Sequence, residues 1–389
     1  MLARLAVAAL ALTTLAACTD HSTPTAPSAA PKPSFSRSGD DDQNDDGAGV
    51  GAVFVSTNSA IANAVVAFSR GADGALTLGG CVPTGGRGVG GTADPLASQF
   101  ALTLSANAHT LFVVNAGSNE VSSLAVHGSR LTLRSRVTSG GVRPVSVASG
   151  RQAVYALNAG SNTVAVIPID DDGELASSPV QVVNLGAGAA GAAAVRLSRN
   201  GHLLTVTERL SGTIDSYVVE RDGTLRGLTT TRSAGTTPFG FDYTPRGQIV
   251  VSEAGSRSAS SYQQAPDGSL RLVSGAIPTQ QIAPCWVIVD NAGRFAYVVN
   301  SGSQTISGFA IGANGSLSLP AANVVAGFFG AGAQPLDVDL SRDGKFLYAL
   351  ENGTGTVGVA LTNGDGTLTV LPDAPGLVAR AGYMGLAAY

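Results

Sequence analysis

One phrase that occurs three times constrains the fold of this chain more than any other feature of its sequence. LFVVNAGSNEVSSLAV at 111–126 returns as VYALNAGSNTVAVIPI at 154–169 and as AYVVNSGSQTISGFAI at 296–311. Seven apolar runs end on a polar residue in this way, and we call these residues the anchors: Asn58, Asn115, Asn158, Glu208, Glu253, Asn300 and Glu351. The steps between them are 57, 43, 50, 45, 47 and 51 residues, so seven repeats fill residues 50–389.

The sixth repeat shows what each unit contains. PCWVIVD (284–290) and FAYVVN (295–300) are apolar runs joined by a glycine turn, TISGFAI (305–311) alternates, and SLSLPAANVV (316–325) follows. Turns rich in Gly, Asn and Asp are typical of β-hairpins, because these residues tolerate a positive φ. No segment shows a 3.6-residue apolar period, so we expect almost no helix. A period of this length made of four short strands predicts an all-β chain, a seven-bladed β-propeller with four-stranded antiparallel blades.

The two ends of the repeat region predict how the ring closes. The first repeat begins with GAVFVSTN (51–58), which matches a second strand and leaves the innermost strand of blade one missing. YMGLAAY (383–389) matches an innermost strand with no blade after it. We therefore expect the C-terminal strand to complete blade one, which removes an exposed sheet edge.

The residues before the repeats predict export and a membrane anchor. A short apolar segment after Arg4 ends in Leu15-Ala16-Ala17-Cys18, which resembles a bacterial lipobox. The resemblance implies that residues 1–17 are a lipoprotein signal peptide and that Cys18 is lipidated, as a periplasmic or outer-membrane lipoprotein of the cell envelope. An ordinary signal peptide remains the alternative. Residues 18–49, rich in Pro, Ser and Thr and ending in an acidic run, are expected to be a disordered tether.

The repeat also carries a family resemblance. Repeats two, three, six and seven combine into P-x-x-V-x-x-S-x-D-G-+-x-L-Y-V-x-N-x-G-S-x-T-V-S, which resembles the seven-bladed lactonase-type propellers with YVTN-like repeats. That family includes 6-phosphogluconolactonases and carboxymuconate-lactonizing enzymes. The resemblance covers residues 50–389 and is specific for fold more than for reaction, because one fold serves many functions.

Strand geometry predicts where a ligand would bind. The first strand of each blade starts, and the second ends, at one face of the disc around the mouth of the axial channel, where we expect a small-molecule site. Besides the anchors Glu253, Asn300 and Glu351, this site would include Trp286, for which core packing is the alternative role. The resemblance implies that Glu208 is the acid–base residue. Lactone opening also needs cations for the substrate anion, which Arg209 and Arg143 would supply.

Two functions remain open from the sequence alone. One is a lactonase or lactonizing isomerase acting on a small sugar-acid or dicarboxylic lactone. The other is a non-catalytic extracytoplasmic propeller that binds a protein, glycan or small ligand. RPVSVAS (143–149) lacks the His that the family carries at this point, and the Glu anchors can instead hydrogen-bond the next turn.

The remaining sequence features concern nucleic-acid, cofactor and metal binding and a possible disulfide. The net charge of −4 does not indicate a nucleic-acid partner. GRGVGG (86–91) fits a dinucleotide motif, but no helix is expected to follow it. We expect no cofactor, no metal site and a monomer. Cys81 and Cys285 are a possible disulfide, which would need the glycine-rich stretch 79–95 to lean across the mouth.

Overall fold

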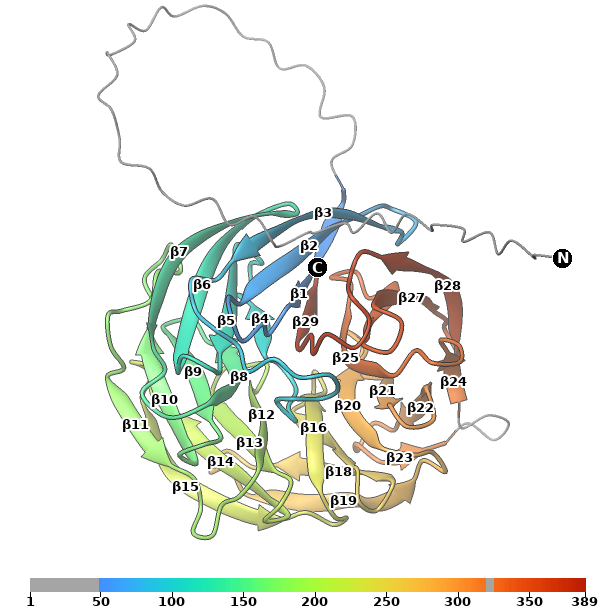
Figure 1. Ribbon diagram of the computed structural model, residues 1–389. Helices are drawn as coiled ribbons and strands as arrows, with labels where there is room; N and C mark the ends of the chain where they lie inside the picture. Colours follow the sequence, from blue (N-terminus) through green and yellow to red (C-terminus); the bar gives the residue numbers. More distant parts are fainter. Residues whose placement is uncertain (1–48, 320–324) are drawn as a thin grey trace, which may run out of the picture. The chain divides into compact units, whose positions relative to one another are not determined.

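The computed structural model describes residues 49–319 and 325–389, and every regular element in these residues is a β-strand. Seven antiparallel sheets stand around one axis, each with its innermost strand near the centre and its last strand at the rim (Figure 1). The predicted seven-bladed propeller is therefore confirmed. No element of the described residues is a helix long and apolar enough to cross a bilayer.

From the axis outward the strands follow chain order in every blade except the first, where the C-terminal strand is innermost. Blade one has β29 (Leu386–Ala388), β1 (Gly51–Ser56), β2 (Ala64–Arg70) and β3 (Leu76–Pro83). Blade two has β4 (Leu102–Leu104), β5 (Thr110–Asn115), β6 (Glu120–His127) and β7 (Arg130–Thr138). Blade three has β8 (Pro144–Ser149), β9 (Ala153–Asn158), β10 (Thr163–Pro168) and β11 (Gln181–Asn184). Blade four has β12 (Ala192–Leu197), β13 (Leu203–Glu208), β14 (Thr213–Val219) and β15 (Leu225–Arg232).

The last three blades follow the same order. Blade five has β16 (Pro238–Tyr243), β17 (Gln248–Glu253), β18 (Ser258–Gln264) and β19 (Leu270–Pro278). Blade six has β20 (Pro284–Val289), β21 (Phe295–Asn300), β22 (Thr305–Ile311) and two short outer pieces, β23 (Leu317–Ser318) and β24 (Val325–Phe328). Blade seven has β25 (Pro335–Leu340), β26 (Phe346–Glu351), β27 (Thr356–Thr362) and β28 (Leu368–Pro375).

Burial explains why the second strands repeat so closely. β5, β9, β13, β17 and β26 are buried at all six of their residues, because neighbouring blades cover both faces of the sheet. A strand covered on both faces reads as a continuous apolar run rather than an alternating one. The outer strands, such as β7 and β15, are mostly exposed.

The register between innermost and second strands shows which strand ends lie on the same face of the disc. In five blades the first residue of the innermost strand pairs with the anchor that ends the second strand, for example Ala192 with Glu208 and Pro238 with Glu253. Innermost strands therefore begin, and second strands end, on the same side. We call this side the mouth face, and the side with the hairpin turns between second and innermost strands the opposite face.

The ring closes through the C-terminal strand, as expected from the sequence. β29 pairs antiparallel with β1, with Val53 opposite Ala388 and Val55 opposite Leu386. The hydroxyl group of Tyr389 donates a hydrogen bond to the carbonyl oxygen of Gly128 in the neighbouring blade at 2.9 Å. The two ends of the propeller chain thus share one sheet, near the C-terminal label in Figure 1.

Candidate functional site

The connection between β3 and β4 enters the axial channel, where Gln99 bridges several blades. The side-chain amide of Gln99 donates to the carbonyl oxygen of Val287 at 2.7 Å and accepts from the amide of Val287 at 3.3 Å. The backbone amide of Gln99 donates to the carbonyl oxygen of Ala193 at 3.1 Å, and its carbonyl oxygen accepts from the hydroxyl of Ser146 at 2.7 Å. Gln99 is completely buried. One residue therefore ties blades three, four and six together at the axis.

The residues beside Gln99 are held in the same way. The indole nitrogen of Trp286 donates to the carbonyl oxygen of Ser98 at 2.9 Å, and the amide of Phe100 donates to Asp337 at 3.2 Å. Burial raises the pKa of Asp337 to about 8. We call residues 98–100 the axial segment. Its hydrogen bonds to blades three, four, six and seven place it at the centre of the ring, where the sequence predicted an open channel mouth.

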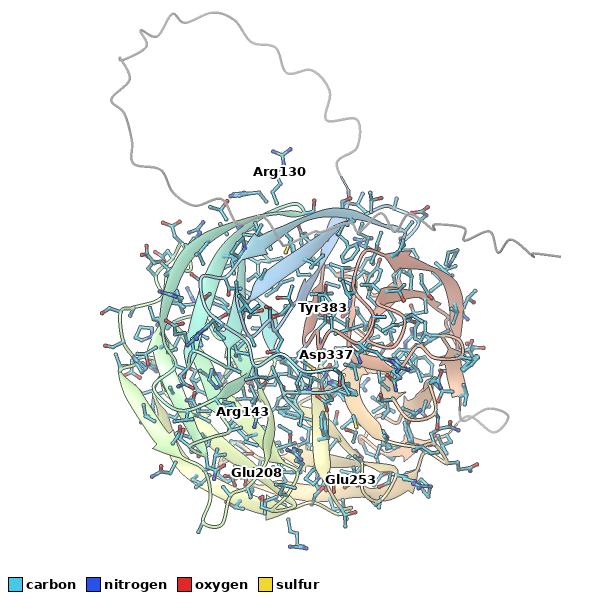
Figure 2. All side chains as sticks on the ribbon, in the orientation of Figure 1. Arg130, Arg143, Glu208, Glu253, Asp337 and Tyr383 are labelled. Atoms are coloured by element: carbon cyan, nitrogen blue, oxygen red, sulfur yellow. The ribbon has the colours of Figure 1, made fainter. Side chains whose placement is uncertain are left out.

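Glu208 lies inside blade four rather than at an opening. Its side chain is completely buried, and Oε2 accepts hydrogen bonds from the hydroxyl of Ser211 at 2.8 Å and the amide of Ala190 at 3.2 Å, while Oε1 has no partner. Burial, and then the neighbouring carboxyl group of Asp215, raise the pKa of Glu208 to about 7. Figure 2 shows Glu208 and Glu253 lying farther from the axis than Asp337. The role of Glu208 as an acid–base residue stays a prediction, in a position that solvent does not reach.

The other predicted mouth residues are also internal, and their role in ligand binding stays a prediction. Glu253 is completely buried and accepts hydrogen bonds from four donors, at distances of 2.6–2.9 Å: the hydroxyls of Ser233, Ser258 and Ser260 and the amide of Gly235. Both oxygens of this carboxylate already accept hydrogen bonds within the protein. Its partners are the following turn and strand and the preceding connection, as in the alternative role that the sequence suggested.

Asn300 and Glu351 follow the same pattern in blades six and seven. The amide nitrogen of Asn300 donates to the hydroxyls of Thr305 and Ser307, at 3.1 and 2.9 Å. Glu351 accepts from the hydroxyls of Thr354 and Thr356, and burial raises its pKa to about 7. Both anchors are completely buried. The repeated polar residue therefore fixes the turn between the second and third strands, which explains its recurrence.

Arg143 and Arg209, by contrast, both lie on the mouth face near residues 94–95. The guanidinium of Arg143 donates to the carbonyl oxygen of Pro95 at 2.8 Å. Burial raises the pKa of Asp94 to about 6, although the charge of Arg209 lowers it. The Nε atom of Arg209 is buried without a hydrogen-bond partner. Sequence reasoning missed Asp94, whose only signal was that it is the one acidic residue in the glycine-rich stretch 79–95.

Trp286 and Cys285 belong to the core of the ring. Trp286 is 1% exposed and packs edge-to-face on Phe239, with ring centroids 5.2 Å apart, so it is not available to stack on a ligand. Cys285 is a free, buried thiol, and burial raises its pKa. The possible Cys81–Cys285 disulfide is therefore wrong. The physical reason is position, because Cys81 lies in the outermost strand β3 and Cys285 in the innermost strand β20.

Two cavities lie away from these residues. One, of about 490 Å³, opens on the mouth face between blades one and two and includes Arg87, Glu120 and Arg136. The other, of about 450 Å³, opens on the opposite face and includes His109, His127 and Arg342. Neither includes Glu208 or the group of Asp94, Arg143 and Arg209. Within the described ranges, no three His, Cys, Asp or Glu side chains are placed to hold a metal ion.

These features agree with the comparison to known families. The model of the family "Lactonase, 7-bladed beta-propeller" matches residues 88–188 and 179–288. The chain belongs to this lactonase-type propeller family, which supports a lactonase-like function at the level of the family. No curated protein sequence matches the chain.

Solved structures share the fold at low sequence identity. A protein of Lactobacillus plantarum aligns with a TM-score of 0.70 and 20% identity, covering 87% of this chain and 99% of its own. A proposed 6-phosphogluconolactonase of Bacteroides uniformis aligns with a TM-score of 0.70, 18% identity and the same two coverages. The periplasmic gluconolactonase of Pseudomonas aeruginosa aligns with a TM-score of 0.65 and 18% identity, covering 87% of this chain and 98% of its own. At these identities the likeness concerns the fold alone.

Proposed function

We propose that this chain is a non-catalytic member of the lactonase-type propellers, which uses its mouth face for binding. The observation that carries the proposal is the axial segment, which fills the place where the sequence predicted a substrate pocket. A small-molecule site normally needs a concave pocket that buries most of its ligand. Neither of the two cavities lies at the axis.

The chemistry of lactone opening supports the same proposal. A general base must come within about 3 Å of the water that attacks the lactone carbonyl, directly or through one water. Glu208 has no exposed surface, and Glu253 is completely buried and accepts four hydrogen bonds within the protein. The three His residues of the described chain, His109, His127 and His202, lie in or beside turns on the opposite face. No imidazole of these residues is therefore available at the mouth.

An activity assay tests this proposal. The purified chain is incubated with 6-phosphogluconolactone, glucono-δ-lactone and muconolactone, and proton release is followed for wild type and for Glu208→Gln. We expect both proteins to match the protein-free rate. Hydrolysis above that rate that is lost in Glu208→Gln would overturn the proposal, and would mean that the buried carboxyl group becomes accessible.

One observation favours a second candidate, lactone hydrolysis at Asp94. Asp94 as a residue is partly exposed, and burial of its carboxyl group gives it a pKa of about 6, which suits a base near neutral pH. Asp94 would take a proton from the attacking water as the ester C–O bond breaks, the proton would pass to the ring oxygen, and Arg209 would hold the substrate anion. In the same assay, this candidate requires turnover that rises with pH around 6 and disappears in Asp94→Asn.

We also propose that the protein is anchored in the cell envelope through Cys18. The support is the lipobox-like Leu15-Ala16-Ala17-Cys18 after a short apolar segment, together with a tether that lacks hydrophobic periodicity. Metabolic labelling with a radioactive fatty acid tests it. Label is expected on the wild-type protein and not on Cys18→Ser, and equal labelling of both would contradict the anchor.

A further inference from the structure

The mouth face carries a ring of exposed aliphatic side chains. They are the large apolar residues of the turns and connections on this face, and each is more than half exposed: Ile61 (79%), Val142 (52%), Leu210 (68%), Ile282 (52%) and Val378 (61%). They come from positions all around the ring, in or beside blades one, three, four, six and seven. Single exposed apolar residues are common on proteins, but five on one face, spread around the ring, indicate an interaction surface.

Three side chains of this ring pack closely against glycines. A Cβ atom on Gly160 would meet the side chain of Val142 at 2.8 Å, and one on Gly302 would meet Ile282 at 2.6 Å. A Cβ on Gly191 would likewise meet Leu210 at 2.5 Å. These three aliphatic side chains thus lie directly against the backbone of an adjacent turn.

The fully exposed charged side chains in the loops of this face are arginines. Four exposed arginines occupy its loops and are absent from the ion pairs of the described residues: Arg87, Arg143, Arg257 and Arg380. The carboxylates placed at this face are buried or partly buried, and they are Asp94, Glu120, Glu208, Glu253, Glu351 and Asp373. The turns of the opposite face instead expose carboxylates and arginines together, such as Asp222 with Arg221 and Asp343 with Arg342.

We propose that the mouth face docks onto an anionic lipid surface, with the five aliphatic side chains in the headgroup layer and the arginines on lipid phosphates. This inference rests on the proposed binding role of the mouth face and names its partner. Apolar side chains interleaved with basic ones are the features that bind proteins to anionic membrane interfaces. Arginines near such a surface are attracted to its negative charge.

The arrangement of the residues favours a lipid surface over a protein partner. Hot spots of protein interfaces are rich in Trp, Tyr and Arg and cluster near the centre of the contact. In this ring the centre is taken by the buried axial segment, Trp286 is internal, and the exposed apolar residues are aliphatic and lie around the periphery. A ring of this kind matches a flat, extended partner. The proposed anchor on Cys18 would bring the face close to such a surface but is not needed for the docking itself.

Hydrogen exchange with vesicles tests the proposal on the full chain carrying Cys18→Ser, which cannot be acylated there. We expect vesicles of phosphatidylglycerol and phosphatidylcholine in equal parts to slow amide exchange in residues 140–143, 209–212 and 279–283. Pure phosphatidylcholine vesicles should protect these loops far less. Residues 199–202, 221–223 and 266–268, on the opposite face, should exchange as they do without vesicles.

Two pairs of matched variants make the test specific, and vesicle sedimentation measures their effect. Leu210→Ser with Ile282→Ser should lower partitioning at least ~10-fold, because both remove apolar surface from the interface. Leu228→Ser with Leu272→Ser, on exposed outer strands, should leave it unchanged. Arg257→Glu with Arg380→Glu should also lower partitioning at least ~10-fold, and Arg151→Glu with Arg246→Glu, on the opposite face, should not.

The following outcomes would contradict the proposal that the mouth face docks onto a lipid surface. Absent protection, or protection of the opposite face, would show that the mouth face does not dock onto lipid. Protection of the mouth loops by a soluble envelope-protein fraction and not by vesicles would assign the face to a protein partner. Lactone turnover in the activity assay would contradict the proposed non-catalytic function but leave these vesicle results unaffected, so the two failures are distinguishable.

Discussion

The side-chain amide of Gln99 donates a hydrogen bond to the carbonyl oxygen of Val287, 188 residues farther along the chain, at a distance of 2.7 Å. The same side chain accepts from the amide of Val287, so it pairs with the innermost strand of blade six almost as another strand would. Gln99 belongs to the connection between blades one and two. This one contact shows that the centre of the ring is filled by the chain itself.

Replacing Gln99 by Ala should therefore destabilise the whole ring. The substitution leaves both backbone groups of Val287 without their buried partner, which we expect to lower the free energy of unfolding by about 2–3 kcal/mol. Urea denaturation measures this loss. Gln152→Ala, at an exposed turn, is the control and should stay within about 0.5 kcal/mol of wild type. Equal stability of the two variants would show that the Gln99 contact does not support the ring.

The buried carboxyl group of Glu208 makes stability fall as the pH rises. Its pKa is about 7 in the folded protein and 4.5 as its ordinary value, so between these pH values the folded state binds more protons than the unfolded state. Glu208→Gln cannot lose a proton. Between about pH 5 and about pH 8, the variant should lose less stability than wild type, by on the order of 1–3 kcal/mol.

Glu253→Gln is the matched control for Glu208→Gln. The same change at Glu253 breaks hydrogen bonds, because both oxygens of this side chain accept them. Three of the four donors to Glu253 point at one oxygen, Oε1, and the fourth points at Oε2. In the Gln variant, an amide nitrogen replaces one of the two oxygens and cannot accept a hydrogen bond. The donors that face this nitrogen are left unpaired, so the variant should be less stable by about 2 kcal/mol at both pH values. Urea denaturation of both variants at the two pH values checks the contrast. A parallel pH dependence of Glu208→Gln and wild type would mean that Glu208 does not titrate in this window.

The C-terminal strand should be essential to the ring. Deleting residues 386–389 removes β29, exposes the edge of β1 and uncovers the apolar residues packed against it. We expect Tm to fall by ~5–10 °C and the protein to aggregate more readily. Tyr389→Phe removes only the hydrogen bond to Gly128 and should change Tm by no more than ~2 °C. Calorimetry that finds the deletion as stable as Tyr389→Phe would contradict closure by β29.

Cys285 should be inert until the protein unfolds. Its thiol is buried, and burial raises its pKa, so little reactive thiolate forms at neutral pH. Iodoacetamide followed by peptide mapping should modify Cys285 in urea and leave it unmodified in the native protein. Rapid native labelling, or a Cys81–Cys285 peptide found without reductant, would mean that the inner end of blade six is open.

Much of the fold was predictable because the repeat states it several times. Each copy combines an apolar run, a polar anchor and a glycine turn. Where one copy departs from this pattern, the other copies still indicate which strands it forms. The closing strand was predictable for the same reason, since Gly51 begins a second strand and Leu386 belongs to an innermost one. The evidence for both the blades and the closing strand therefore came from comparing the repeats with one another.

The candidate site was much less predictable because it depends on features that do not repeat. Glu208 was correctly placed at the end of its strand, but whether a side chain there points to the mouth or into the blade depends on its partners, Ser211 and Ala190. The path of residues 84–101 has no counterpart in the other blades. Neither the glycine-rich pattern nor Gln99 alone indicates that this connection turns into the axis.

Hydrogen exchange at the amides of Gln99 and Phe100 tests the closed centre of the ring most directly. These amides donate to the carbonyl oxygen of Ala193 and to Asp337, in blades four and seven. If the axial segment fills the channel, both should exchange as slowly as the amides of the buried strand β20, through opening of the whole ring. Exchange at the rate of an exposed loop would contradict the closed channel, and with it the proposal that the mouth face binds its partner without a substrate pocket.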